Sequence, residues 1–308
     1  MGNAQIVGGV SFHGGSVQAA TVEDRTDRFI IRSIQENPSD ILVGSWKNTL
    51  DLPEAADRTA TALTKVFDPD GVPQALSVAL PRTAAFLLST PSDPSLQPQE
   101  VREHVEWELS NYYKGPAFQH IVSNFVRLKP LGQHPAESIL IVALQRTILG
   151  TLQAACKSLR SKLQVLDIDH FCVESLLMTY YPNARTQHVL LIGNEEDRIQ
   201  LSLLADSQLR QYRSQFGMDD RRKVEEVRMV IDRCRSAGIE VDALFLYGDL
   251  LNHSTLTALR SGVKVPVDYV DINGILSSGA RECLPGRHSQ SLHPSRFAPC
   301  IGAAIRKA

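Results

Sequence analysis

Few residues of this 308-residue chain have the types and spacing that chemistry requires. Asp167 and Asp169 stand two positions apart ahead of an expected helix, so they could form a carboxylate pair, although such residues more often cap the helix. The turn Gly14-Gly15-Ser16, which follows His13, could hold an anion, but a tight hairpin that needs a positive φ explains it better. His13 is accordingly interpreted as a turn residue.

Signatures of other enzyme classes are missing. The chain has no GxSxG or comparable nucleophile elbow, and its nine histidines are dispersed with no pair at metal-ligand spacing on one element. Its five cysteines include no CxxC and fit reduced cytosolic thiols better than a disulfide framework. We therefore expect neither a metal site nor disulfides.

The composition is that of a globular protein. A hydrophobic content of 43% over this length predicts about two domains. The net charge of −2 without any basic run argues against nucleic acid as a partner. No apolar run approaches the ~20 residues of a membrane span, and the first residues lack a secretory leader, so a cytoplasmic protein with no direct membrane span is expected.

Hydrophobic patterning predicts two halves of similar plan. Residues 5–34 alternate Gly-rich turns with β-branched residues, as two or three strands would, and 53–67 have helical periodicity. A second run of three strands over 188–216 repeats this meander, and a clear helix follows at 219–236. Between the halves, residues 83–166 are interpreted as a small α+β unit.

The stretch Leu76–Pro116 is the most informative part of the chain. A buried strand ending in Leu-Pro leads to an amphipathic helix that begins at Pro98. Apolar residues recur along it at helical spacing, and the other face is charged. The end of this helix carries Trp107, Tyr112, Tyr113 and Lys114, which core packing explains only in part and an interface explains more easily. Together with Arg102 on the charged face, these are the predicted partner-binding residues.

Six segments occur in an order that resembles the PilM family of type IV pilus assembly proteins, which are actin-like ATPases related to FtsA: LPRTAAFLLS, EVREHVEWEL, SILIVALQRTIL, VLDIDHFCVESLL, VEEVRMVIDR and FAPCIGAAI. The resemblance implies an α/β actin-like (ribonuclease H-like) fold. Residues 1–182 would form the first domain, with a PilM/FtsA-type insertion subdomain at 83–166. Residues 183–308 would form the second, whose C-terminal helix returns to the first. Only 217–223 remain where the family has a subdomain that clasps the base, so the second small subdomain is expected to be reduced.

The resemblance also implies a nucleotide site that has lost its main ligands. Actin-like ATPases hold phosphates between two Gly-containing hairpins, each led by an Asp. In the first hairpin Ser11 stands in place of the Asp, His13 in place of a Gly, and Gln18 in place of a Lys. The second hairpin has no Asp in its triplet ending at Gly193, and an acidic turn that would repel phosphate follows it.

The adenosine side is altered as well, because one glycine, Gly248, stands where the family has several. We therefore expect a pseudo-ATPase with no catalytic residues and no cofactor. The remnants of its nucleotide loops would be Ser11, His13, Gly14, Gly15, Ser16, Gly193 and Gly248.

By resemblance, the protein would be a cytoplasmic scaffold or adaptor of a type IV pilus or related secretion machine. It would bind the cytoplasmic tail of a PilN-like inner-membrane partner in a groove between the insertion and the first subdomain. That partner would hold it at the inner face of the inner membrane. If the aromatic residues are interface anchors, Trp107→Ala or Tyr113→Ala should weaken partner binding by on the order of 2 kcal/mol.

Two alternatives remain. The chain could be an active actin-like ATPase or a sugar-kinase-like phosphotransferase that binds ATP with Mg²⁺, for which the only acidic candidates in the cleft are Glu195, Glu196, Asp197 and Asp249. It could also be the cytoplasmic domain of a type II secretion L protein. The sequence leaves a homo-oligomer open.

Overall fold

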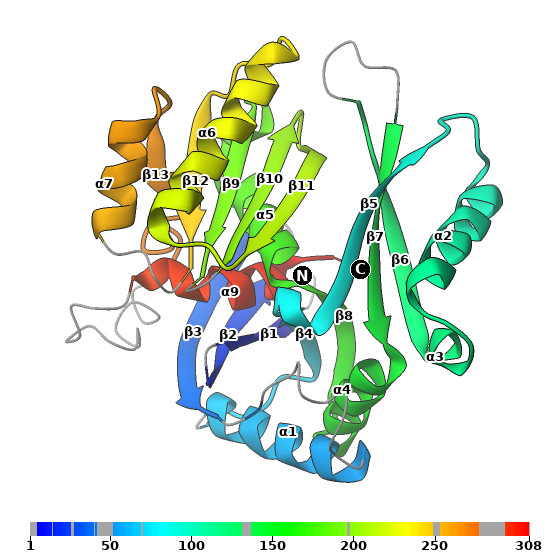
Figure 1. The fold of residues 1–308 in the computed structure, drawn as a ribbon. Coiled ribbons are helices and arrows are strands. Elements are labelled where there is room, and N and C mark those ends of the chain that lie inside the picture. The colour runs from blue at the N-terminus through cyan, green and yellow to red at the C-terminus, as the bar shows by residue number, and fades with distance from the viewer. Residues whose placement is uncertain are drawn as a thin grey trace.

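The fold contains two five-stranded sheets and one three-stranded sheet (Figure 1). This computed structural model describes residues 5–13, 15–25, 28–39, 41, 52–68, 70–130, 137–195, 198–248, 253–276 and 293–307. Within these residues, no helix is long and apolar enough to cross a membrane.

The first sheet begins as an antiparallel meander and continues with parallel strands. Strands β1 (Gln5–His13), β2 (Ser16–Asp24) and β3 (Phe29–Pro38) form the meander, and β4 (Ala75–Leu80) and β8 (Lys162–Ile168) extend it in the order β3-β2-β1-β4-β8. All residues of β4 are buried, as predicted for a strand that is covered on both faces.

Helices cover both faces of this sheet. Helices α1 (Leu52–Phe67) and α4 (Arg146–Ser158) pack side by side below it in Figure 1. On the other side lie α5 (Asp169–Tyr180) and α9 (Ala298–Ile305), and α9 contacts β1, β2 and α5. Every residue of α9 is buried, so this helix is a core element.

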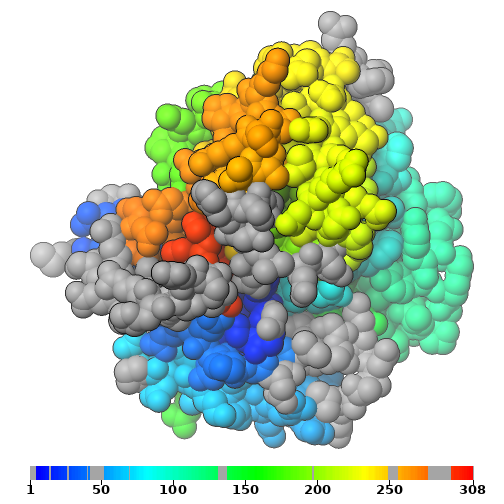
Figure 2. Space-filling view, turned by 60° about the vertical axis from the view of Figure 1, so that its left-hand side comes forward, coloured from blue at the N-terminus to red at the C-terminus, as the bar shows by residue number. Residues whose placement is uncertain are grey.

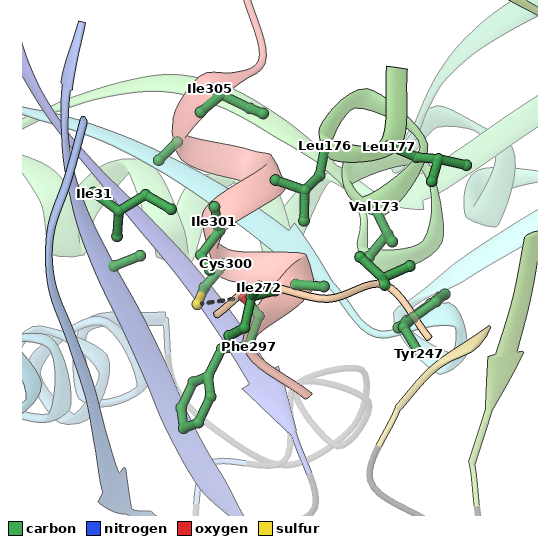
Figure 3. Close-up of a cluster of buried hydrophobic side chains, with 14 of the residues drawn as sticks. Ile31, Val173, Leu176, Leu177, Tyr247, Ile272, Phe297, Cys300, Ile301 and Ile305 are labelled. Atoms are coloured by element: carbon green, nitrogen blue, oxygen red, sulfur yellow. Dashed lines mark hydrogen bonds between the residues drawn. The ribbon is translucent and has the colours of Figure 1, made fainter. Parts of the chain in front are cut away.

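The core around α9 joins the two halves of the chain (Figure 3). Ile31 from the first sheet and Tyr247 from the second belong to the same cluster of buried residues as Ile301 of α9. Leu176 and Leu177 of α5 belong to this cluster too. The two halves therefore share one continuous apolar core.

The second sheet repeats the plan of the first. The meander of β9 (Val189–Asn194), β10 (Arg198–Ala205) and β11 (Gln208–Phe216) is extended by parallel strands β12 (Ala243–Tyr247) and β13 (Val267–Tyr269) in the order β11-β10-β9-β12-β13.

Helices α6 (Asp220–Ser236) and α7 (His253–Gly262) pack against each other in this half. The Asp219 side chain caps α6 by accepting a hydrogen bond from the backbone N–H of Arg222. In the space-filling view, this half (yellow and orange) lies above the blue residues of the first sheet (Figure 2).

A three-stranded antiparallel sheet, which we call the insertion sheet, stands beside the first five-stranded sheet. Its strands β5 (Ala85–Ser92), β7 (Glu137–Gln145) and β6 (Ile121–Leu128) occur in that order, and α2 (Pro98–Tyr112) covers one face. The helical periodicity of the sequence predicted α2 correctly, and the apolar residues that pack against the sheet are Val101, Val105 and Leu109. The shorter helices are α3 (Pro116–Gln119), η2 (Arg82–Ala84), η3 (Pro182–Arg185) and η4 (Pro294–Phe297).

The boundary of this inserted unit differs from the expected 83–166. Strand β8 pairs with β4, and α4 packs on α1, so both belong with the first sheet. The part with its own sheet therefore runs from 85 to 145. The alternation of side chains along β8 would suit a strand of either sheet. Only its pairing with β4, which is distant in the sequence, assigns it to the first sheet.

Candidate functional site

The first hairpin carries a closed set of polar side chains where the resemblance places a phosphate site. Ser11 and Gln18 are opposite each other in the β1–β2 register, and 2% and 0% of their surfaces are exposed. The Gln18 amide lies 3.1 Å from Ser11 Oγ and, suitably oriented, accepts from Arg296 Nε at 3.0 Å. Arg296 also forms an ion pair with Glu36 at 2.6 Å. The hydrogen-bonding groups of Ser11 and Gln18 are therefore satisfied within the protein, and the positive charge of Arg296 balances Glu36.

The turn of this hairpin uses its polar groups internally as well. Ser16 Oγ lies 2.6 Å from Glu36 Oε1 and 3.1 Å from the backbone oxygen of His13. Gly15 has a φ of 86°, which a side chain would strain. These contacts agree with a tight hairpin, whereas Gly14 lies outside the described residues.

Gly193 in the second hairpin and Gly248 directly after β12 allow these two segments to pack closely. A Cβ on Gly193 would lie 2.6 Å from the Tyr247 hydroxyl, and a Cβ on Gly248 would lie 2.2 Å from the backbone oxygen of Asn194. Tyr247 is itself buried. Packing within the protein therefore explains both glycines without any ligand.

Glu195, the described acid of the turn in the second hairpin, is neutralised by the protein. Glu195 forms an ion pair with the buried Arg198 and accepts a hydrogen bond from Gln200 at 2.9 Å. The buried amine of Lys223 donates to the backbone oxygen of Glu195. The other acidic candidates, Glu196, Asp197 and Asp249, lie outside the described residues.

The expectation that Asp167 and Asp169 cap a helix is wrong. The N-cap of α5 is Ile168, which has no capping side chain, and Asp169 is the first helical residue, whose carboxylate accepts from the backbone N–H of His170 at 2.6 Å. Asp167 instead forms an ion pair with Arg306 at 2.5 Å, and Asp169 accepts from Gln200 at 3.3 Å. Burial raises the pKa of Asp169, and the charges of Arg198 and His13 oppose that shift.

The described residues of the two hairpins do not fit a magnesium nucleotide. Such a ligand needs a carboxylate for the metal and open backbone N–H groups for the phosphates. Ser11 is no carboxylate, and the carboxylate of Glu195 is already paired. Within the described parts of the chain, no three His, Cys, Asp or Glu residues gather as a metal-ligand set.

A groove of about 420 Å³ lies between the insertion sheet and the edge of the first five-stranded sheet. On one side it is lined by residues 122–126 of β6 and by side chains of β7 that point away from α2. Leu166 and Ile168 of β8 and Phe171 of α5 line the opposite side, and Leu209 of β11 reaches it from the second sheet. Its lining is mainly apolar, as in many ligand sites.

Three sheet edges meet at this groove. Strands β6, β8 and β11 are the outermost strands of their respective sheets. Consecutive residues of β6 and β8 line the groove, 122–126 and 166–168. The outer edge of a strand carries N–H and C=O groups that can pair with another extended segment. The groove thus combines apolar side chains with backbone edges.

One part of the groove is charged. Arg306 donates to Asp167, to the backbone oxygen of Phe171 at 2.7 Å, and to Ser175 Oγ at 2.8 Å. Glu174 on α5 accepts the hydroxyl of Ser202, and burial raises its pKa to about 8. Sequence reasoning missed Glu174, although a lone acid in the apolar run FCVESLLM was a signal.

Buried hydrogen bonds connect Glu174 with the second hairpin. His170 Nε2 lies 2.9 Å from Ser202 Oγ, and His170 Nδ1 lies 2.8 Å from the Tyr247 hydroxyl. Burial lowers the pKa of His170 to about 3, so its ring is neutral at ordinary pH. The neutral imidazole of His170, which lies between the groove and Gly193, can therefore form hydrogen bonds with both Tyr247 and Ser202.

The predicted partner-binding residues of the insertion helix are not at the groove. The rings of Tyr112 and Tyr113 pack against Phe86 at 4.8 and 5.7 Å between centroids, on the face of the sheet that α2 covers. Trp107 is 61% exposed, and Arg102 and Lys114 are exposed on the same unit. Their role in partner binding stays a prediction, and any surface they form is separate from the groove.

No family model matches the chain, and no curated protein matches it. Among solved structures, it is similar to a PilM–PilN type IV pilus biogenesis complex, with 14% identity over 97% of this chain and 98% of that chain and a TM-score of 0.69. A Bacteroides thetaiotaomicron protein of unknown function with an actin-like ATPase fold is 10% identical over 90% and 95% of the two chains, with a TM-score of 0.53.

A more distant likeness is to the cytoplasmic domain of EpsL, an inner-membrane component of the type II secretion system of Vibrio cholerae. It is 12% identical over 79% of this chain and 82% of that chain, with a TM-score of 0.46, and supports no argument. The first two likenesses confirm the α/β actin-like fold that the order of segments predicted.

Proposed function

We propose that this protein is a scaffold that binds the cytoplasmic tail of an inner-membrane protein of a pilus or secretion machine and does not hydrolyse ATP. The groove between the insertion sheet and the edge of the first five-stranded sheet carries this proposal. The likeness to a PilM–PilN complex supports it by suggesting the kind of partner. Such a partner would hold the protein in the cytoplasm, at the inner face of the inner membrane.

The groove suits an extended segment better than a compact ligand. Its volume of about 420 Å³ can accommodate several side chains, and the outer strands of sheets run along it. A peptide beside such an edge gains affinity from main-chain hydrogen bonds and specificity from alternate side chains. A membrane protein's tail is free to adopt this conformation before it binds.

The contacts of the two hairpins support the part of the proposal that excludes nucleotide. Arg296 and Glu36 already provide partners for the polar side chains of the first hairpin. In the second hairpin, Tyr247 packs against Gly193. An active ATPase or phosphotransferase needs an available acid, and the carboxylate of Glu195 is paired with Arg198.

A substitution in the groove tests the proposal. Val126 is 48% exposed and lines the groove, so Val126→Asp should leave the fold intact while placing a charge against an apolar ligand. We expect at least about a tenfold loss of affinity, or about 1.4 kcal/mol, for labelled N-terminal tail peptides of inner-membrane pilus and secretion proteins. Fluorescence anisotropy measures the change.

Trp107→Ala is the matched control, because Trp107 is exposed on the helix across the sheet from the groove. Its affinity for the peptide should stay within about twofold of wild type. If Trp107→Ala weakens binding and Val126→Asp does not, the partner binds to α2, as the sequence-based assignment predicts. If no tail peptide binds, the scaffold proposal is wrong.

A further inference from the structure

The charged part of the groove contains one acid whose bonding capacity is not used up. Asp167, Glu174 and Arg306 are the charged residues among the described residues that line it. The rest of the lining is apolar or neutral, so any charge on a bound segment must be matched by these three side chains. Their existing bonds determine which of them is available.

Arg306 and Asp167 are already committed to each other. The guanidinium of Arg306 pairs with Asp167 at 2.5 Å and donates two further hydrogen bonds, to the Phe171 backbone and to Ser175. The other carboxyl oxygen of Asp167 accepts from the backbone N–H of Ile168 at 2.7 Å, so both of its oxygens are engaged. The pair therefore contributes little net charge to the groove.

Glu174 is in a different situation. One of its carboxyl oxygens accepts the Ser202 hydroxyl, and within the described residues the other forms no hydrogen bond. The groups around it are Ser202 of β10, with His170 behind it, and the charges of Arg306 and Asp167. A half-buried carboxyl with one open oxygen at a groove is suited to receive a donor from a ligand.

We propose that the segment bound in the groove is an extended, mainly apolar strand with one Lys or Arg whose cation forms an ion pair with Glu174. This inference rests on the proposed scaffold function and specifies the chemistry of its partner. The apolar lining holds the neighbouring side chains of the strand, and the open carboxyl oxygen of Glu174 fixes its register.

The ion pair should make binding depend on pH. Burial raises the pKa of the free Glu174 to about 8, and an arriving cation favours the ionised form, so binding releases a proton below that pH. Affinity should therefore rise between about pH 6 and 8, by at most about tenfold per unit. Lys and Arg stay charged in this range, His170 stays neutral, and Asp167 keeps its pairing with Arg306.

The experiment combines a change in the protein with a change in the peptide. The probe is the tail peptide that binds best to wild type, compared with versions in which each Lys or Arg is replaced by norleucine. We expect about a tenfold loss for one such replacement, about a tenfold loss for Glu174→Gln, and little further loss when both are combined. Glu174→Gln should also abolish the pH dependence.

Glu106→Gln is the control, because Glu106 is an exposed acid on α2, across the sheet from the groove. It should leave both the affinity and its pH dependence unchanged. The norleucine peptides test the same ion pair with unaltered protein, so the result does not depend on the folding of Glu174→Gln. Equal binding to wild type and Glu174→Gln at every pH, or a tight peptide without any basic residue, overturns the inference and leaves the scaffold function standing. Absence of all peptide binding overturns both.

Discussion

The groove beside the insertion sheet and the two hairpins between the domains are both places where an actin-like fold could hold a ligand, yet they are built in opposite ways. The hairpins are filled with groups that satisfy one another, such as Arg296 with Glu36 and Arg198 with Glu195. The groove keeps apolar side chains, outer strands and one incompletely bonded acid, Glu174.

Under the proposed function, this difference would show how a nucleotide site can be lost without loss of the fold. A buried polar group without a partner destabilises a protein by about 1–3 kcal/mol, so a hairpin that no longer holds phosphate must find internal partners. Arg296 is such a partner in the first hairpin, and Arg198 is one for Glu195 in the second. A groove that binds a ligand, as we propose for this one, has no such need and can keep open positions.

The largest effect on stability is expected from Arg296→Ala. Only 10% of the Arg296 side chain and 15% of the Glu36 side chain are exposed, so the substitution leaves a carboxylate with little solvent and takes a partner from Gln18. The free energy of unfolding should fall by about 3 kcal/mol, as measured by urea denaturation.

The exposed pair of Arg221 and Glu225 provides the control, with side-chain exposures of 88% and 55%. Arg221→Ala should change the free energy of unfolding by less than about 0.5 kcal/mol. If Arg296→Ala has an equally small effect, the first hairpin is not held by internal ion pairs, and the contrast with the groove is lost.

A smaller effect is expected from Gly193→Ala, which tests whether Tyr247 fills the second hairpin. The new methyl group would meet the Tyr247 hydroxyl at 2.6 Å, so the substitution should destabilise the protein by about 2 kcal/mol. In a Tyr247→Leu background it should have almost no effect, because the colliding atoms are gone. Thermal unfolding of the four proteins measures this coupling.

Gly150→Ala controls for the general effect of adding a methyl group. Its Cβ would have only an ordinary contact, 3.7 Å from Leu52, within helix α4, so the substitution should be neutral or stabilising by up to about 1 kcal/mol. An equal loss from Gly193→Ala in both Tyr247 backgrounds would show that Tyr247 is not what requires the glycine.

A third effect on stability concerns Glu174 and depends on pH. Its pKa is raised from 4.5 to about 8 in the folded state, so the folded protein binds the proton more tightly than the unfolded chain. The contribution of the Glu174 proton to the free energy of unfolding is fully present below about pH 4.5 and is lost as the pH rises to about 8. Relative to wild type, Glu174→Gln should therefore gain roughly 1–3 kcal/mol between pH 5 and pH 9. Parallel thermal-unfolding curves for the two proteins across this range would contradict a buried, proton-binding Glu174.

The sequence was sufficient for elements whose signals are local. Helix α2 follows from Pro98 and the spacing of Val101, Val105 and Leu109, and the buried strand β4 follows from its uninterrupted apolar run. The order of such elements also predicted the actin-like fold, which the comparison with solved structures confirms.

Features that depend on contacts between distant residues could not be predicted in this way. The capping rule that was applied to Asp167 is local, whereas its partner Arg306 is far along the chain. The end of the insertion was misplaced because β8 pairs with β4 across the whole inserted unit. The groove combines β6, β8 and α5, and only the fold brings Val126 and Glu174 to one site.

The central claim is that the groove binds a peptide and the hairpins bind no nucleotide. Isothermal titration of one protein preparation with the tail peptide and, separately, with Mg-ATP tests it most directly. We expect saturable heat with the peptide and none with millimolar Mg-ATP, because Ser11, Gln18 and Glu195 are occupied by internal partners. Saturable Mg-ATP binding without peptide binding would contradict it and indicate an active nucleotide site.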